Sequence, residues 1–231
     1  MSKSSSSETS TEEIPAQLLP IEKNYESRLR TILTNIVKML TERNLLKLEN
    51  LDKNTKKITS IKTDDNIYRI NLDLPENHVY GKNNNEMIIR IINQKIKNYS
   101  KTSTIAEFIN QFKNHPKIIV VLSISTKIRQ LIQNDKTSPF TEIFLEKELL
   151  INIVDHVSVP KHIVLSAEMS KKVLEDYHIK KKEIPKILLN DPISRYYNVK
   201  PGQIFKIIRP SETTCTAPYY RMVVKGLMKE S

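Results

Sequence analysis

Glycine is scarce in this chain: only three glycines occur in 231 residues, at positions 81, 202 and 226. Phosphate-binding loops of the G-x-G-x-x-G and G-x-x-x-x-G-K types need glycines close together, so both are excluded. The single cysteine excludes a disulfide scaffold and a multi-cysteine zinc site. A chain of this length, with 39% hydrophobic and 27% charged residues, is instead typical of a soluble globular protein of one or two domains.

The ends and the charge of the chain suggest where it acts. Residues 1–20 begin with the Ser- and Glu-rich stretch 1–13, which has almost no apolar side chains, and this predicts that 1–20 is a disordered tail without a secretory signal. The longest apolar runs, such as 118–122, are far below the roughly 18 residues of a membrane span. We therefore expect an intracellular protein that does not bind membranes. The net charge of +11 suggests a polyanionic partner, but it divides as −2 over 1–20, +7 over 21–154 and +6 over 155–231.

Residues 21–154 predict an α/β domain. Apolar residues at three- and four-residue steps predict a helix over 25–42. A compact β-branched run predicts a buried strand over 117–122, followed by a short capped helix over 126–132. The remaining expectations are loops at 50–66 and 76–86, helices at 87–96 and 104–112, and strands at 67–74, 140–144 and 149–154.

Residues 155–231 predict a smaller α+β domain with a short mixed sheet, which makes the whole chain α+β. Ser166 is a typical N-cap for a helix that reaches Tyr177, and Asp191-Pro192 is a usual start for a short helix. Asn198 follows that helix where a left-handed residue is needed, a conformation that Asn tolerates. Pro201-Gly202 predicts a turn, and 204–208 and 219–224 predict paired strands.

Signals for catalysis or metal binding are weak. The five histidines (78, 115, 156, 162 and 178) include no His-x-x-x-His pair, so we predict no metal site. Cys215 lies in a polar stretch with no base nearby in sequence, which favours a surface thiol over a nucleophile. One common nuclease core needs an acidic residue two positions before a lysine, and no lysine here has one. Glu146-Lys147-Glu148 comes closest and is typical of a solvated helix start. We therefore predict no catalytic residue and no cofactor.

The last third of the chain carries four motif blocks in a fixed order. They are Asp155–His162 with Leu165-Ser166, then 184–187, then 191–203, and finally 204–213 with Tyr220-Arg221. This set resembles the signature of the RNA polymerase subunit 5 family, which has archaeal as well as eukaryotic members. Asn198 stands where the family usually has Gly, and 214–218 replaces a Gly-containing turn. The first 150 residues match far less, and what survives is the order of elements between 117 and 153.

The resemblance implies a non-catalytic polymerase subunit. Its C-terminal assembly domain, residues 155–231, would dock on the largest subunit beside a subunit 6 homologue. Residues 21–154 would form a jaw that projects toward downstream double-stranded DNA. Archaeal members lack the jaw, so the eukaryotic or large-DNA-virus form is implied, in the nucleus or in a virion or viral factory. The expected assembly residues are His156, Pro160, Lys161, His162, Asp191, Pro192, Arg195, Tyr196, Tyr197, Gly202, Arg209, Ser211, Tyr220 and Arg221.

Two questions stay open on the residues alone. Tyr196 and Tyr197 are adjacent in a helix, so one could belong to the core while the other offers interface area. The expected DNA contact is Ser125, Thr126, Lys127 and Arg129, because a helix N-terminus suits phosphate; a simple capped surface helix is the alternative. For the whole chain, the alternative function is a free-standing basic DNA-binding factor or nuclease-like protein.

Overall fold

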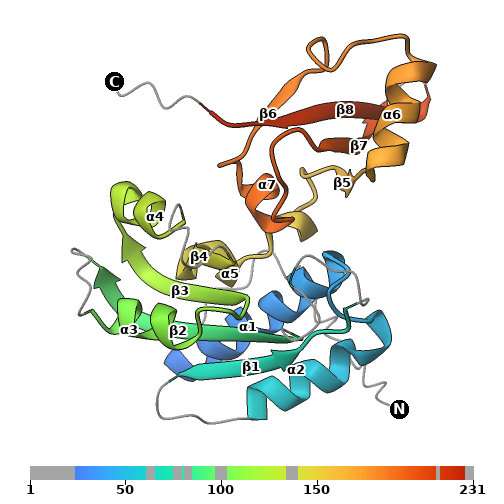
Figure 1. The fold of residues 1–231 in the computed structure, drawn as a ribbon. Helices are drawn as coiled ribbons and strands as arrows, with labels where there is room; N and C mark the ends of the chain where they lie inside the picture. Colours follow the sequence, from blue (N-terminus) through green and yellow to red (C-terminus); the bar gives the residue numbers. More distant parts are fainter. Residues whose placement is uncertain are drawn as a thin grey trace, which may run out of the picture.

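The computed structural model describes residues 24–60, 66–74, 80, 85–96, 103–133, 140–211 and 214–226. These residues form two four-stranded mixed sheets, with strand orders β1-β2-β3-β4 and β5-β7-β8-β6. The α+β fold class is confirmed. Figure 1 shows two lobes, a first one holding α1 to α5 and a second one holding β5 to β8. The predicted tail, 1–20, lies outside the described residues, as does most of the predicted loop at 76–86.

The first lobe is a sheet with helices on both faces. Strand β2 pairs antiparallel with β1 and parallel with β3, and β3 pairs parallel with β4. Helices α1 and α2 cover one face, and α3 and α4 cover the other. The elements are α1 (Tyr25–Glu42), η2 (Leu48–Asn50), α2 (Leu51–Ser60), β1 (Ile67–Asn71), β2 (Glu86–Ile96), α3 (Thr104–Gln111), β3 (Lys117–Ile124), α4 (Thr126–Gln133), β4 (Thr141–Leu145) and α5 (Glu146–Leu150).

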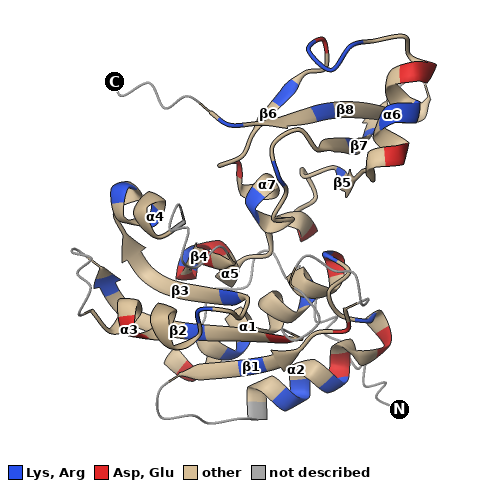
Figure 2. Ribbon diagram, viewed as in Figure 1, with Lys and Arg blue, Asp and Glu red and all other residues tan. Residues whose placement is uncertain are grey.

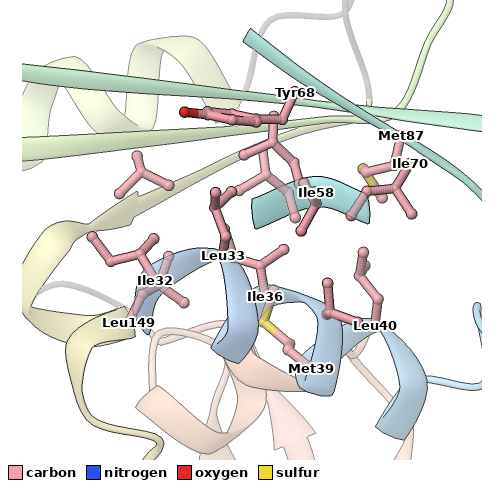
Figure 3. Packing of buried hydrophobic residues seen from close by; sticks show 14 of the residues in the cluster. Ile32, Leu33, Ile36, Met39, Leu40, Ile58, Tyr68, Ile70, Met87 and Leu149 are labelled. Atoms are coloured by element: carbon pink, nitrogen blue, oxygen red, sulfur yellow. The ribbon is translucent and has the colours of Figure 1, made fainter. Parts of the chain in front are cut away.

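The main core lies between α1 and the sheet. Leu33, Ile36 and Leu40 recur along one side of α1 and are fully buried against the strands. Figure 3 shows these side chains pointing toward Ile58 of α2 and Met87 of β2. The helix predicted over 25–42 is thus confirmed, because its apolar face covers a sheet that would otherwise expose aliphatic side chains.

Residues 87–96 were expected to be helical, and this prediction is wrong: they form the central strand β2. Met87, Ile88 and Ile89 are all fully buried, because helices cover both faces of the sheet at this point. A strand buried on both sides has a continuous apolar run in place of alternation. The many isoleucines in this run favour a strand, which is the signal that the helical interpretation overlooked.

Two other expectations in the first lobe are also wrong. The polar segment 50–66 was expected to be a loop, but it contains α2, whose Leu51 and Ile58 pack into the core cluster. The strand expected at 149–154 is instead the end of α5 followed by the 3-10 turn η3 (Ile153–Asp155). In both places a short helix needs few apolar anchors, so its period is too brief to recognise.

The second lobe is smaller and its sheet is short. It contains β5 (Lys161–Val164), α6 (Ala167–Asp176), β6 (Lys186–Leu188), α7 (Pro192–Tyr196), β7 (Ile204–Ser211) and β8 (Cys215–Val224). Strands β7 and β8 are antiparallel, β5 adds antiparallel to β7, and β6 adds parallel to β8. The predicted mixed sheet, paired strands and two helices are confirmed. Helix α6 packs on one face of the sheet and α7 lies by the other.

Capping hydrogen bonds and residues with positive φ define the turns and helix ends of the second lobe. The Ser166 hydroxyl accepts from the Met169 N–H at 3.2 Å, and the Asp191 carboxylate accepts from the Ile193 N–H at 2.9 Å. Asn198 has φ 47° and Gly202 has φ 90°, so both predicted left-handed or turn positions are confirmed. A Cβ on Gly202 would meet nothing within 4 Å, so glycine serves the backbone conformation there and not a close approach.

Candidate assembly and nucleic-acid interfaces

The first motif block forms a bent segment stabilised by its own backbone. The His156 ring nitrogen Nδ1 accepts from the Ser158 N–H at 3.1 Å. His162 Nδ1 lies 2.7 Å from the Pro160 carbonyl oxygen, a contact that requires a proton on Nδ1. The His162 ring packs edge-on against Phe205, and burial lowers the pKa of His162. A neutral His162 therefore keeps Nε2 as an acceptor, while Lys161 next to it is exposed.

Strands β7 and β8 present an aromatic ring between two arginines. The Arg209 guanidinium lies 5.1 Å from the centroid of the Tyr219 ring, and the Arg221 guanidinium lies 5.5 Å from it. Both arginines are exposed, so their outward N–H groups are available to a partner. Sequence reasoning selected the two arginines and missed Tyr219. The spacing of two residues between Tyr219 and Arg221, which puts both side chains on one face of a predicted strand, could have found it.

The other expected assembly residues of this lobe lie outside the cluster of Arg209, Tyr219 and Arg221. Ser211 is half-buried and pairs with Cys215 near the end of β7. The Tyr220 ring faces the opposite side, where it packs against Tyr177 after α6 at 5.6 Å, and burial raises the pKa of Tyr220. Asp191, Pro192 and Gly202 shape the backbone around α7. The structure therefore divides the expected assembly residues between more than one face.

Arg195 lies at the junction between the two lobes. Its Nη1 and Nη2 donate to both oxygens of Glu148, at 2.7 and 3.0 Å. Nη2 also donates to the Ile143 carbonyl oxygen at 2.9 Å, and the guanidinium lies over the Phe144 ring at 5.1 Å. Glu148 also accepts from the Leu145 N–H at 2.8 Å. Burial by itself would raise the pKa of Glu148, but the hydrogen bonds from Arg195 and Leu145, together with the charges of Arg195 and Arg129, hold this pKa below its usual range.

A second arginine at the same junction comes from the first lobe. Arg43, directly after α1, donates from Nη1 and Nη2 to the two oxygens of Glu142, at 2.9 Å each. Its Nε donates to the Tyr196 carbonyl oxygen at 2.6 Å, and its Nη2 to the Arg195 carbonyl oxygen at 3.1 Å. Asn198 adds a hydrogen bond to Glu142 at 3.0 Å. No local motif marks Arg43 or Glu142, and sequence reasoning missed both. The interpretation of Glu146-Lys147-Glu148 as a solvated helix start is wrong, because Glu146 is buried and Glu148 binds Arg195.

The two adjacent tyrosines also face the first lobe. Tyr196 is buried in the core cluster that contains α1, while Tyr197 is half-buried and packs against Phe205 of β7. The Tyr197 hydroxyl donates to Glu42 at 3.1 Å, and burial together with this carboxylate raises the pKa of Tyr197. Of the two alternatives for this pair, Tyr196 therefore belongs to a core, and that core is the first lobe's.

The four expected DNA-contact residues lie at the start of α4. Ser125, Thr126 and Lys127 are exposed. Arg129 instead turns inward, and its Nη2 lies 3.6 Å from Glu148. Burial and the charge of Arg195 lower the pKa of Arg129. The structure thus leaves three of these residues open to a ligand and directs the fourth to the lobe junction.

A cleft of about 860 Å³ opens beside this junction. Residues of both lobes line it, including Arg43, Glu142, Arg195, Asn198, Lys200 and Lys225. Figure 2 shows Lys and Arg spread over both lobes. Within the described ranges, no cluster of three or more His, Cys, Asp or Glu could hold a metal ion. In that same part of the chain, no helix is long and apolar enough to cross a membrane.

Comparison with known proteins identifies relatives for both lobes. Residues 151–223 match the family model described as RNA polymerase Rpb5, C-terminal domain. The chain is 30% identical over 217 residues to "DNA-directed RNA polymerase subunit 5" of Acanthamoeba polyphaga mimivirus, an alignment that covers 90% of this chain and 97% of that relative.

Cellular relatives match a shorter stretch. The "DNA-directed RNA polymerases I, II, and III subunit RPABC1" of Caenorhabditis elegans is 39% identical over 107 residues, or 46% of this chain. The Dictyostelium discoideum protein of the corresponding name is 46% identical over 83 residues, or 36% of this chain. The chain spans 51% of the length of the nematode relative and 42% of that of the Dictyostelium one.

Proposed function

The chain belongs to the RNA polymerase subunit 5 family, and from that membership we propose that it is a non-catalytic subunit of a multisubunit DNA-directed RNA polymerase. The observation that carries the proposal is the mimivirus polymerase subunit 5, whose likeness covers nearly the full length of both chains. The second lobe, residues 155–231, is the assembly domain, and it docks on the largest subunit beside a subunit 6 homologue. The first lobe, 21–154, is the jaw.

The chemistry of the second lobe suits a docking role. The exposed Arg209 and Arg221 flank the half-buried Tyr219 on one face of the sheet, which combines planar donors with a large ring. The bent segment from His156 to His162 adds a neutral imidazole and the exposed Lys161. The protein would act where its polymerase acts, in the nucleus of a cell or in the virion or viral factory of a large DNA virus.

Affinity purification tests the assembly role. Tagged full-length protein should capture the two large polymerase subunits from its source cells, and a free monomer in that lysate would contradict the proposal. The Arg209→Glu/Arg221→Glu variant should reduce the captured subunits by at least about tenfold, because it reverses two charges in the interface. The Lys53→Glu/Lys56→Glu variant is the matched control, since it reverses two exposed charges on α2. Equal capture by both variants would exclude this face as the docking surface.

For the jaw, we propose that the start of α4 contacts downstream duplex DNA through Ser125, Thr126 and Lys127. Free N–H groups at the helix start and the Lys127 amine suit phosphate, so the contact is independent of sequence and weakens with salt. Arg129 faces Glu148 on the side of α4 away from the proposed contact, and this ion pair stabilises the helix.

A cross-linking experiment in the assembled polymerase tests this contact. A photoreactive group at 126 should cross-link to downstream DNA at low salt and lose the product as salt rises. Lys127→Glu should weaken the cross-link on every DNA sequence alike, whereas Lys147→Glu on α5 should leave it unchanged. A cross-link that survives Lys127→Glu at full yield would contradict the proposed contact.

A further inference from the structure

At the junction, each lobe contributes one arginine that donates hydrogen bonds to backbone carbonyl oxygens of the other lobe. Arg43 of the first lobe donates to the carbonyl oxygens of Tyr196 and Arg195, at 2.6 and 3.1 Å. Arg195 of the second lobe donates in return to the carbonyl oxygen of Ile143, at 2.9 Å. The first two carbonyls belong to the last residues of α7, where the helix has no further N–H of its own to donate to them. The Arg195 carbonyl oxygen also accepts from the Asn198 N–H at 3.1 Å. The third belongs to β4, an edge strand of the first sheet.

Each arginine is held in place by a carboxylate of the first lobe. Glu142 binds Arg43 and Glu148 binds Arg195, both through two parallel hydrogen bonds. Side-chain exposure is 4% for Arg43 and 16% for Arg195, so water competes little with these contacts. A planar guanidinium that donates two parallel hydrogen bonds to one carboxylate cannot rotate about its own axis. Each guanidinium therefore fixes a direction as well as a distance between the lobes.

Burial adds a third fixed point at the junction. Tyr196 from α7 lies in the core cluster of α1, at 5% exposure, while Ile153 and Val154 of η3 pack against core clusters of both lobes. Domains joined by small polar contacts ordinarily move relative to one another. Here Arg43, Arg195 and Tyr196 join the lobes through separate contacts, so a large relative rotation of the lobes would have to break some of them.

We propose that Arg43 and Arg195 are positioning residues that lock the two lobes into one rigid body. The proposal rests on the proposed function in one respect: rigidity matters because the second lobe docks on the polymerase and the first must reach DNA. Docking of one lobe then sets where the other points. Arg195 thus acts within the molecule, in place of the contact with a partner subunit that its motif had suggested.

Distances between spin labels on the two lobes test the lock in the isolated full chain. Cys215 is exposed and is the only cysteine of the chain, so Lys53→Cys provides a second label site on α2. We expect one narrow distance distribution between positions 53 and 215. Arg195→Met should broaden it, and Arg43→Met/Arg195→Met should broaden it further. Arg195→Lys keeps the charge but loses the planar guanidinium, so its distribution should be intermediate.

The matched control is Lys200→Met, which removes a cation from the same cleft and leaves the hydrogen bonds of Arg43 and Arg195 in place. A distribution for Arg195→Met as narrow as that of Lys200→Met, with native circular dichroism, would overturn the lock. If the double variant does not fold, Glu148→Gln together with Arg195→Lys gives the same comparison at smaller amplitude. A broad distribution in the otherwise unaltered chain would also overturn it.

Polymerase experiments separate this inference from the proposed function. Arg195→Met should still capture the large polymerase subunits but lose most of the cross-link from 126 to DNA. Loss of both readouts together would mean that Arg195 contacts a partner directly, against the lock. If the distance distribution behaves as expected but no polymerase subunit is captured, the lock stands and the proposed function fails.

Discussion

The two lobes reach a folded state by different means. The first buries long aliphatic surfaces, with Leu33, Ile36, Met87 and Ile118 all fully inaccessible. The second has two small core clusters and depends on capped helices, turns and fixed backbone angles. Aliphatic cores accept exchanges among Ile, Leu and Val, whereas a cap or a left-handed position accepts few residue types. The recognisable motifs therefore lie in the lobe with the smaller core.

Removing a core side chain should show the difference most strongly. Leu33→Ala leaves a cavity beneath the first sheet, and we expect a loss of about 3–5 kcal/mol of unfolding free energy. Leu165→Ala in the second lobe should cost only about 2–3 kcal/mol, because its smaller cluster can relax toward solvent. Chemical denaturation followed by circular dichroism measures both. An equal or greater loss for Leu165→Ala would contradict the comparison.

Residues of both lobes contact one another at the junction, so the loss of a junction contact should destabilise both lobes. Arg43→Met removes both guanidinium bonds to Glu142, which keeps its hydrogen bond from Asn198. It also removes the donor to the Tyr196 carbonyl oxygen, while the Arg195 carbonyl oxygen keeps its hydrogen bond from the Asn198 N–H. We expect a cost of about 3 kcal/mol, near the lower end for breaking a buried pair. Hydrogen exchange should report faster opening of amides in α7 as well as at the end of α1. Exchange confined to α1 would show that the second lobe does not depend on this contact.

The features that could be predicted from the sequence are those that depend on residues close together in the chain. Ser166 and Asp191 were recognised as caps and Asn198 as a left-handed residue, because each such role depends on one residue type at one position. Strand β2 was mistaken for a helix because its burial on both faces depends on helices distant in sequence. Glu148 was interpreted as part of a solvated helix start for the same reason: Arg195 lies 47 residues from it, and nothing local marks the two as partners. Only tertiary structure shows that these charges are shielded.

Lys117 offers a test of burial within the first lobe. Its side chain is almost inaccessible at the start of β3, and Nζ donates to the His115 carbonyl oxygen at 3.2 Å. Burial lowers the pKa of Lys117 to about 8, below the value of an unfolded lysine. Between these two values the unfolded chain binds more protons than the folded one, so stability rises with pH.

We expect this lysine to add up to about 2 kcal/mol of unfolding free energy between pH 8 and 9.5. The quantity to measure is the difference between the unaltered chain and Lys117→Met at each pH, in which other titrating groups cancel. The exposed Lys113→Met is the control and should show no such difference. If the Lys117→Met difference is flat across this range, the amine is not buried as described.

The smallest effect concerns asparagines that stand where glycine is common. Asn44 follows α1 and Asn198 follows α7, each with positive φ, 59° and 47°. In a chain with three glycines, asparagine thus serves as the left-handed terminator in both lobes. The two sites differ in one contact, because the Asn198 side chain reaches across the junction to Glu142, at 3.0 Å.

Glycine at each site separates backbone relief from that contact. Asn44→Gly should change the unfolding free energy by no more than about 0.5 kcal/mol, since easier left-handed geometry offsets a more flexible unfolded chain. Asn198→Gly should cost about 1 kcal/mol, because the same exchange also removes a hydrogen bond to a charged group. Parallel denaturation of the two variants gives the difference directly. Equal values would mean that Asn198 serves only its own helix, and that its contact with Glu142 does not help to join the lobes.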